Sequence, residues 1–137
     1  MTPEFCRVSH DPERGQYADC VRACVASILD LPAVNVPHWF DDPENEDGQL
    51  KMQLWLAKRG QAAAVIGLPG ENVLPIVLAF MRDNYPDKHY MLWCNSGGDH
   101  AVIGCNDKIV HNPAWVASSI NGPHSCGLWI IWIICNL

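Results

Sequence analysis

Residues 128–135, Leu-Trp-Ile-Ile-Trp-Ile-Ile-Cys, constrain the fold of this chain more than any other segment. Every residue in the segment is apolar, so a strand formed here presents hydrophobic side chains on both of its faces. Such a strand is stable when other elements cover the sheet on both sides. The segment is too short for a membrane-spanning helix, which needs about 20 residues. We therefore expect the central strand of a buried sheet.

The remaining hydrophobic pattern predicts helices mostly in the first part of the chain and strands in the last third. Apolar residues recur at helical spacing over residues 20–31, where Asp19 stands at the N-cap position and Pro32 ends the helix. Further helices are predicted over residues 49–59 and 73–81, and strands over residues 62–68, 90–94, 100–105 and 108–111. This order predicts an α+β fold, in one domain over residues 1–137.

Composition argues against two classes of partner. The 137 residues carry a formal net charge of −6 without a cluster of Lys and Arg, so we expect no nucleic-acid surface. The seven cysteines would favour disulfides in a secreted protein, but residues 1–10 contain no apolar leader. We therefore expect a cytoplasmic protein with reduced thiols and no membrane partner. The acidic segment 41–47 is interpreted as a solvated loop, and it would equally favour a basic substrate segment.

Cys20 is the candidate nucleophile because it lies at the start of the predicted helix 20–31. The first turn of a helix presents unpaired N–H groups and a partial positive charge, which favour a thiolate and lower the thiol pKa. Cys24 lies one turn further on the same face and is expected to be buried. His100 opens an apolar strand and is the candidate base that completes the activation. The competing histidines are His10, His38, His89, His111 and His124.

A catalytic imidazole needs a third group that fixes its tautomer and orientation, and Asn112 is the candidate for this role. Directly opposed residues of an antiparallel hairpin point to the same face. A strict two-residue turn at 106–107 would place Asn112 opposite Ala101. Asn112 and His100 can oppose each other if the loop has an odd length or the hairpin contains a bulge. The alternatives for the orienting group are Asp99 and His111.

Taken together, these segments resemble the papain-like cysteine peptidases. The shared motifs are Asp-Cys-x-x-Ala-Cys at 19–24, His-Ala-Val-Ile at 100–103 and His-Asn-Pro-Ala at 111–114. They are most similar to the bacteriocin-processing peptidase domains of ABC transporters, and residues 20–40 also resemble small phage- and bacteria-encoded proteins of this kind. The resemblance implies a papain-like fold, in which an N-terminal helix carrying the cysteine packs on a C-terminal antiparallel β-sheet.

The resemblance also implies an oxyanion hole, and here the sequence departs from the family pattern. Arg14 stands where the family has its oxyanion glutamine, six positions before the cysteine, and Gln16 is the nearest substitute. The backbone N–H of Cys20 would be the second donor. Val21 replaces the glycine that follows the nucleophile. Trp115 resembles the tryptophan that shields the ion pair from water, shifted by one residue.

These residues predict a cysteine-nucleophile hydrolase or acyltransferase that needs no cofactor. The thiolate of Cys20 attacks the carbonyl of a peptide or protein substrate, and His100 protonates the leaving amine. Water or another amine then resolves the thioester. A second interpretation is an inactive papain-like scaffold of phage type that binds and inhibits a host protein. A third is a structural zinc site, which the absence of any Cys-x-x-Cys pair makes the weaker interpretation.

Overall fold

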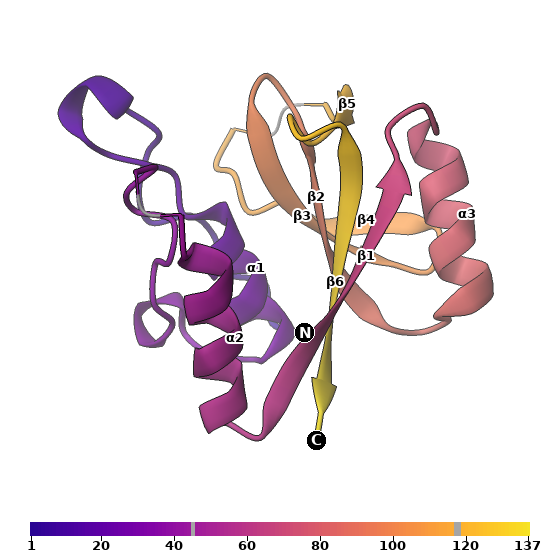
Figure 1. Cartoon of the computed structure of the whole chain (residues 1–137), viewed down its shortest axis with the longest axis horizontal. Coiled ribbons are helices and arrows are strands. Elements are labelled where there is room, and N and C mark those ends of the chain that lie inside the picture. Colours follow the sequence, from indigo (N-terminus) through magenta and orange to yellow (C-terminus); the bar gives the residue numbers. More distant parts are fainter. Residues whose placement is uncertain (45, 117–118) are drawn as a thin grey trace.

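The computed structural model of the chain describes residues 1–44, 46–116 and 119–137. Within these residues, one antiparallel sheet contains six strands in the order β1–β6–β2–β3–β4, and the short β5 pairs with β2 (Figure 1). The strands are β1 (Gln61–Pro69), β2 (His89–Asn95), β3 (Asp99–Cys105), β4 (Lys108–His111), β5 (Gly122–Pro123) and β6 (Leu128–Asn136). The α-helices are α1 (Cys20–Ile28), α2 (Gly48–Lys58) and α3 (Leu74–Asn84), and the 3₁₀ turns are η1 (Pro12–Arg14) and η2 (Ala33–Asn35).

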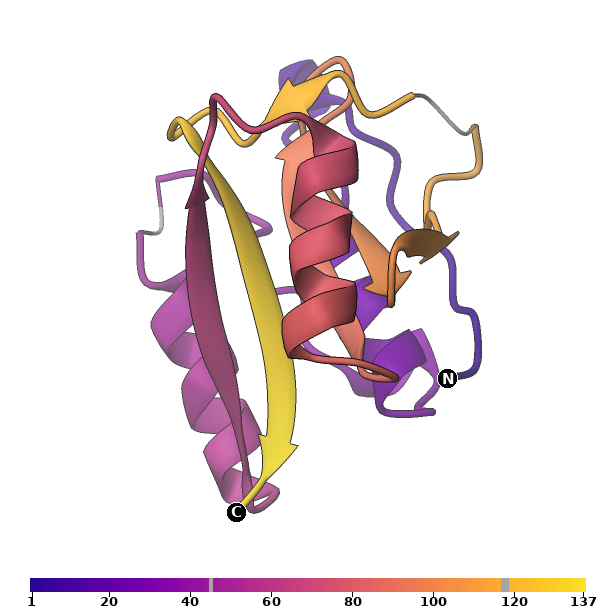
Figure 2. The ribbon, with the colours of Figure 1, turned by 90° about the vertical axis from the view of Figure 1, so that its right-hand side faces the viewer.

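Strand β6 is an interior strand of the sheet and is covered on both faces, as its apolar sequence predicts. It lies between β1 and β2, and its side chains enter two separate clusters of buried residues. Trp132 packs with residues of α1 and α2 on one face, whereas Ile131 and Ile133 pack with α3 on the other. Figure 2 shows α3 and α2 on opposite sides of the sheet. The result is an α+β architecture with helices on both faces, which confirms the predicted fold class at this level.

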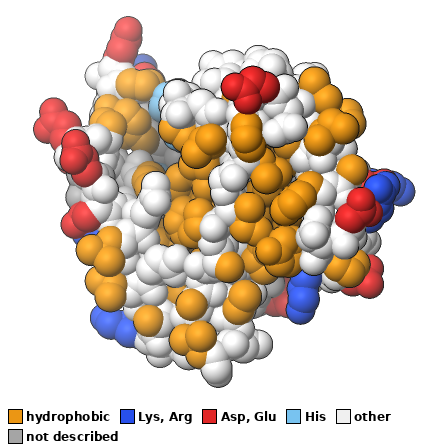
Figure 3. Space-filling model, turned by 45° about the vertical axis from the view of Figure 1, so that its right-hand side comes forward, with side chains coloured by type: hydrophobic (Ala, Val, Ile, Leu, Met, Phe, Trp, Pro, Cys, Tyr) orange, Lys and Arg blue, Asp and Glu red, His pale blue; other side chains and the backbone are white. Residues whose placement is uncertain are grey.

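Some large hydrophobic side chains of the sheet and of α3 remain exposed. Figure 3 shows hydrophobic side chains gathered over β1, β6 and α3. Val65 of β1, Ile76 of α3 and Leu128 of β6 are 50%, 55% and 41% exposed. No helix in the described parts of the chain has the length and apolar character needed to cross a membrane.

The predicted ends of α1 and α3 differ from the structure by three residues, and the short strand β5 was not predicted. Helix α1 ends at Ile28 rather than Leu31, because Asp30 adopts a left-handed conformation (φ 56°) and Leu31 donates its N–H to the carbonyl of Ala26. Helix α3 continues beyond residue 81 to Asn84. The short strand β5 has no signal in the hydrophobic pattern, since it depends on a pairing with β2 that is remote in sequence.

Candidate active site

Helix α1 begins directly after a buried carboxylate. Asp19 occupies the N-cap position, as predicted, but its side chain makes no capping hydrogen bond. The carboxylate instead accepts the backbone N–H groups of Arg7 (2.9 Å) and Val8 (3.1 Å) and two side-chain N–H groups of Arg22 (2.9 and 2.6 Å). Burial alone would raise the pKa of Asp19, but the hydrogen bonds outweigh it, and the pKa lies below its usual value. Asp19 therefore ties the N-terminal segment to α1.

The thiol of Cys20 lies between the first turn of α1 and strand β3. Burial raises the pKa of this thiol above its ordinary value, since Cys20 is 9% exposed. The nearby backbone N–H groups of Ala101 and Val21 lower the pKa of the thiol, but they are the smaller effect. The N–H groups predicted at the start of the helix are therefore present. The prediction that they lower the pKa of Cys20 is wrong, because burial has the larger effect. Cys20 rests as a neutral thiol in this conformation.

His100, at the start of β3, has its tautomer set by Asn112. Its ring Nε2 lies 2.8 Å from Oδ1 of Asn112. The same oxygen accepts the backbone N–H of Ala114 at 3.1 Å, which identifies it as the amide oxygen and as an acceptor toward the ring. Nε2 therefore carries a proton. In the neutral ring, Nδ1 then has a free lone pair that can accept a proton from a thiol.

A β-bulge places Asn112 on the same face as His100. The predicted two-residue turn at 106–107 is present, but the register between β3 and β4 shifts by one residue next to Gly104. The extra residue reverses the face of every residue that follows it. Without the shift, Asn112 would lie opposite Ala101 and point away from the ring. An odd-length loop or a bulge was expected to be necessary for Asn112 and His100 to share a face, and the structure has the bulge.

The two alternative orienting groups are engaged elsewhere. Asp99 accepts the backbone N–H and the hydroxyl of Ser125 at 2.8 and 2.6 Å. Nε2 of His111 donates to the backbone carbonyl of Glu4 at 2.6 Å. Both side chains stabilise the segments around the site, and neither makes the hydrogen bond to the candidate base that Asn112 makes.

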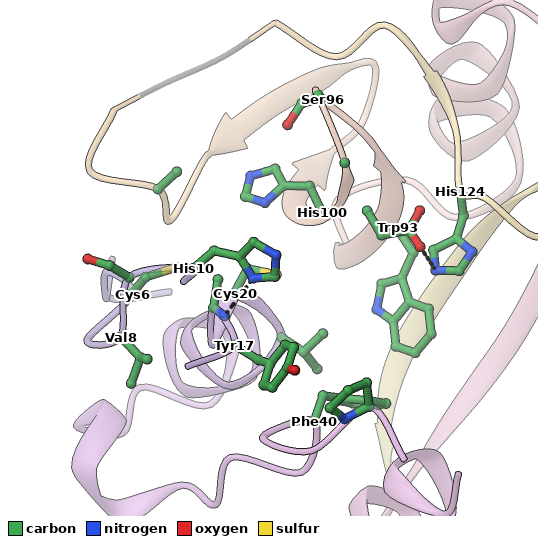
Figure 4. A pocket seen from close by; sticks show the side chains of 18 of the residues that line it. Cys6, Val8, His10, Tyr17, Cys20, Phe40, Trp93, Ser96, His100 and His124 are labelled. Carbon is green, nitrogen blue, oxygen red and sulfur yellow. Dashed lines mark hydrogen bonds and ion pairs between the residues drawn. The ribbon is translucent and has the colours of Figure 1, made fainter. Parts of the chain in front are cut away.

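Cys20 and His100 line the same open cleft, whose volume is about 860 Å³. Figure 4 shows both near one end of this cleft, with Trp93 and His124 toward the other. Asp42, Glu46 and Asp99 also line it, and no Lys or Arg stands among the described lining residues. The volume lies in the range of ordinary ligand-binding sites. The cleft therefore offers a negatively charged space that reaches the candidate nucleophile.

The two residues assigned through the family resemblance lie differently from the family pattern. Gln16 is exposed and is not among the residues that line the cleft. Trp115 lines the rim, where its indole stacks on Phe5 at 4.7 Å and donates to the carbonyl of Cys6 at 2.5 Å. Trp115 is 75% exposed, and the hydrogen bond between His100 and Asn112 is partly buried.

The sequence analysis assigned no role in the site to several residues that line the cleft. His10 and Tyr17 come from the turn before α1, and their rings lie edge to face at 5.9 Å. Trp93 of β2 packs on His124 at 5.7 Å, and its Nε1 is buried without a hydrogen-bond partner in the described structure. The alternation within β2 identifies the face of Trp93, but the neighbours on that face depend on the tertiary fold.

The other thiols near Cys20 are buried and protonated. Cys24 is fully buried, as predicted, and burial raises its pKa well above the ordinary value. Cys6 lines the cleft, and burial, followed by its proximity to Cys20 and Asp19, raises its pKa to about 12. All seven cysteines lie in the described residues and are free. Those residues contain no group of three His, Cys, Asp or Glu side chains that could bind a metal ion.

Comparisons with known proteins give no match: no family model fits the chain, and no curated protein and no solved structure is significantly similar to it. Any assignment of function therefore depends on the geometry of the cleft.

Proposed function

We propose that this protein is a papain-like cysteine hydrolase or acyltransferase that cleaves a peptide or isopeptide amide bond through Cys20, His100 and Asn112. The observation that carries the proposal is the hydrogen bond from His100 Nε2 to an amide oxygen whose orientation is fixed by Ala114. This bond leaves Nδ1 as the free basic atom of a ring that shares its cleft with a thiol.

The raised pKa of Cys20 determines how the reaction would start. Because the thiol is neutral at rest, His100 Nδ1 removes its proton as the sulfur attacks the substrate carbonyl, so that His100 acts as a general base. The carbon–sulfur bond forms, and the tetrahedral intermediate collapses to a thioester as the imidazolium gives the proton to the leaving amine. Water then hydrolyses the thioester, releases the carboxylic acid and restores the thiol. A second amine in place of water gives acyl transfer.

The test is the dependence of Cys20 alkylation on His100. Iodoacetamide at limiting concentration and neutral pH, followed by site-resolved mass spectrometry, gives a rate for each thiol. We expect His100→Ala to slow the alkylation of Cys20 by about 10²-fold or more, and Asn112→Ala to slow it less, because general-base catalysis contributes about 10²–10⁴. The exposed Cys126 is an internal reference whose rate stays constant.

His124→Ala is the matched control for that experiment. His124 lines the same cleft, but its Nε2 lies 3.3 Å from Asp99. We expect Cys20 alkylation to remain within about twofold of the wild-type rate in this variant. Equal rates of Cys20 alkylation in the wild type and in His100→Ala would contradict the proposed activation.

The second candidate function is a non-catalytic papain-like scaffold that binds a host protein. The raised pKa of Cys20 favours it, as do the exposed apolar side chains at the cleft rim, Trp115 (75%) and Val116 (85%). A scaffold needs no activated thiol, so its Cys20 would label at a rate independent of His100. The alkylation experiment therefore separates the two functions.

A further inference from the structure

The turn before α1 sends His10 into the cleft and Gln16 away from it. Asp11 and Gln16 form an antiparallel bridge in which each donates its backbone N–H to the carbonyl of the other, at 2.9 and 3.0 Å. Neighbouring pairs of an antiparallel ladder point to opposite faces. The next pair, His10 and Tyr17, lines the cleft, whereas Asp11 and Gln16 are absent from the lining. The backbone pairing therefore determines which side chain of this turn reaches the nucleophile.

The imidazole of His10 is oriented by two neighbours. Its Nδ1 accepts the backbone N–H of Ala18 at 3.3 Å, and its ring contacts that of Tyr17. Because Nδ1 is an acceptor, the proton of the neutral ring resides on Nε2. Ala18 lies two residues before Cys20 in the sequence. Figure 4 shows the His10 ring at the end of the cleft where Cys20 lies.

Acyl transfer to Cys20 develops a negative charge on the substrate carbonyl oxygen, and that charge requires hydrogen-bond donors. The backbone N–H of Cys20, at the start of α1, is one donor, because the first N–H groups of a helix have no intrahelical partner. We propose that the second donor is Nε2–H of His10, so that His10 is a catalytic residue of the proposed reaction. This inference rests on the proposed function. It assigns to His10 the side-chain donor role in the oxyanion hole that a glutamine has in the family pattern.

Two reactions of the same thiol test the inference. Iodoacetamide alkylates sulfur by direct displacement and forms no oxyanion. p-Nitrophenyl acetate acylates sulfur through a tetrahedral oxyanion, and both products can be mapped to Cys20 by mass spectrometry. We expect His10→Ala to slow acylation about 10²–10³-fold, the usual cost of one oxyanion donor. Its alkylation rate should stay within about twofold of wild type, because alkylation forms no oxyanion that needs the donor.

Two further variants make the comparison specific. His10→Gln keeps a side-chain donor and should recover most of the acylation rate, whereas Gln16→Ala should leave both reactions unchanged. His10 and Gln16 are both exposed, so these substitutions do not disturb the core. The inference is overturned if His10→Ala slows both reactions equally, or if Gln16→Ala gives the selective loss. If Cys20 is alkylated at the same rate in the wild type and in His100→Ala, the proposed function is overturned, and this inference with it.

Discussion

Asp19→Ala is the substitution that most directly tests how the cleft is built. The Asp19 side chain is 0% exposed, and its ion pair with Arg22 has an N–O distance of 2.6 Å. The carboxylate also accepts the backbone N–H groups of Arg7 and Val8, and Val8 lines the cleft. Alanine would leave one partly buried cation, Arg22, and two backbone donors without their acceptor.

The expected cost follows from these lost contacts. Breaking a buried ion pair by removing one partner costs about 3–5 kcal/mol, because the remaining charge stays desolvated. The side chain of Arg22 is 16% exposed, so water can replace only part of the carboxylate. The two backbone donors belong to the same cluster, and their loss is contained in this figure rather than added to it. We therefore expect the free energy of unfolding to fall by about 3–5 kcal/mol, a large share of the total for a domain.

Urea denaturation followed by circular dichroism measures this loss, and the chain provides a matched control. Asp11 and Arg14 form an ion pair with the same residue types and the same spacing, but the Arg14 side chain is 82% exposed and the N–O distance is 3.4 Å. Asp11→Ala should cost at most about 1 kcal/mol. A cost for Asp19→Ala no greater than that for Asp11→Ala would refute the reasoning.

The pH dependence of the unfolding free energy also tests the role of Asp19. Its folded-state pKa is below the ordinary value, so its contribution to stability is present above the pKa of the unfolded chain. That contribution is lost as the pH falls below about 4 and through the folded-state pKa. The difference in unfolding free energy between wild type and Asp19→Ala should therefore shrink in acid. A constant difference from neutral pH to pH 2 would contradict the assignment.

Two further predictions concern the sheet and the buried thiols. Gly104→Ala places a Cβ against the ring of Tyr90, and we expect it to lower the free energy of unfolding, measured by urea denaturation, by about 1–3 kcal/mol. The Cβ of Gly98→Ala meets nothing within 4 Å, so this control should change the free energy of unfolding by less than about 0.5 kcal/mol. Similar values for the two variants would show that the packing around Gly104 is looser than described. Burial raises the pKa of Cys94 to about 12 and that of Cys24 well above its ordinary value, so the folded state retains protons that the unfolded chain loses above about pH 9. The unfolding free energy should then fall between pH 9 and 12 by about 1.4 kcal/mol per pH unit for each such thiol. If the unfolding free energy of Cys94→Ala falls with pH as steeply as that of the wild type, the Cys94 thiol makes no such contribution.

Much of the secondary structure could be predicted because it depends on local periodicity. The apolar residues of β6 alternate between two clusters of buried residues, one on each face of the sheet. A strand buried on both faces needs hydrophobic side chains at odd and even positions alike, and the sequence shows this pattern directly. The start of α1 at Cys20 and the turn at 106–107 also follow from residues close together in the chain. The α+β class follows from the same local signals.

The site depends on interactions that the local sequence does not encode. A one-residue bulge between β3 and β4 determines whether Asn112 meets His100, and a bulge depends on strand pairing rather than on composition. The bridge at the N-terminal turn likewise directs His10 rather than Gln16 into the cleft.

The residue types of the candidate thiol-based site, and the elements that carry them, could be inferred from the sequence. The pKa of the Cys20 thiol depends on the tertiary structure. The first turn of α1 supplies N–H groups that favour a thiolate, as the sequence indicates, but the packing of α1 against β3 removes the sulfur from water. Desolvation grows with every neighbour that the fold brings to the sulfur, so its net effect on the pKa depends on residues that are distant in the chain.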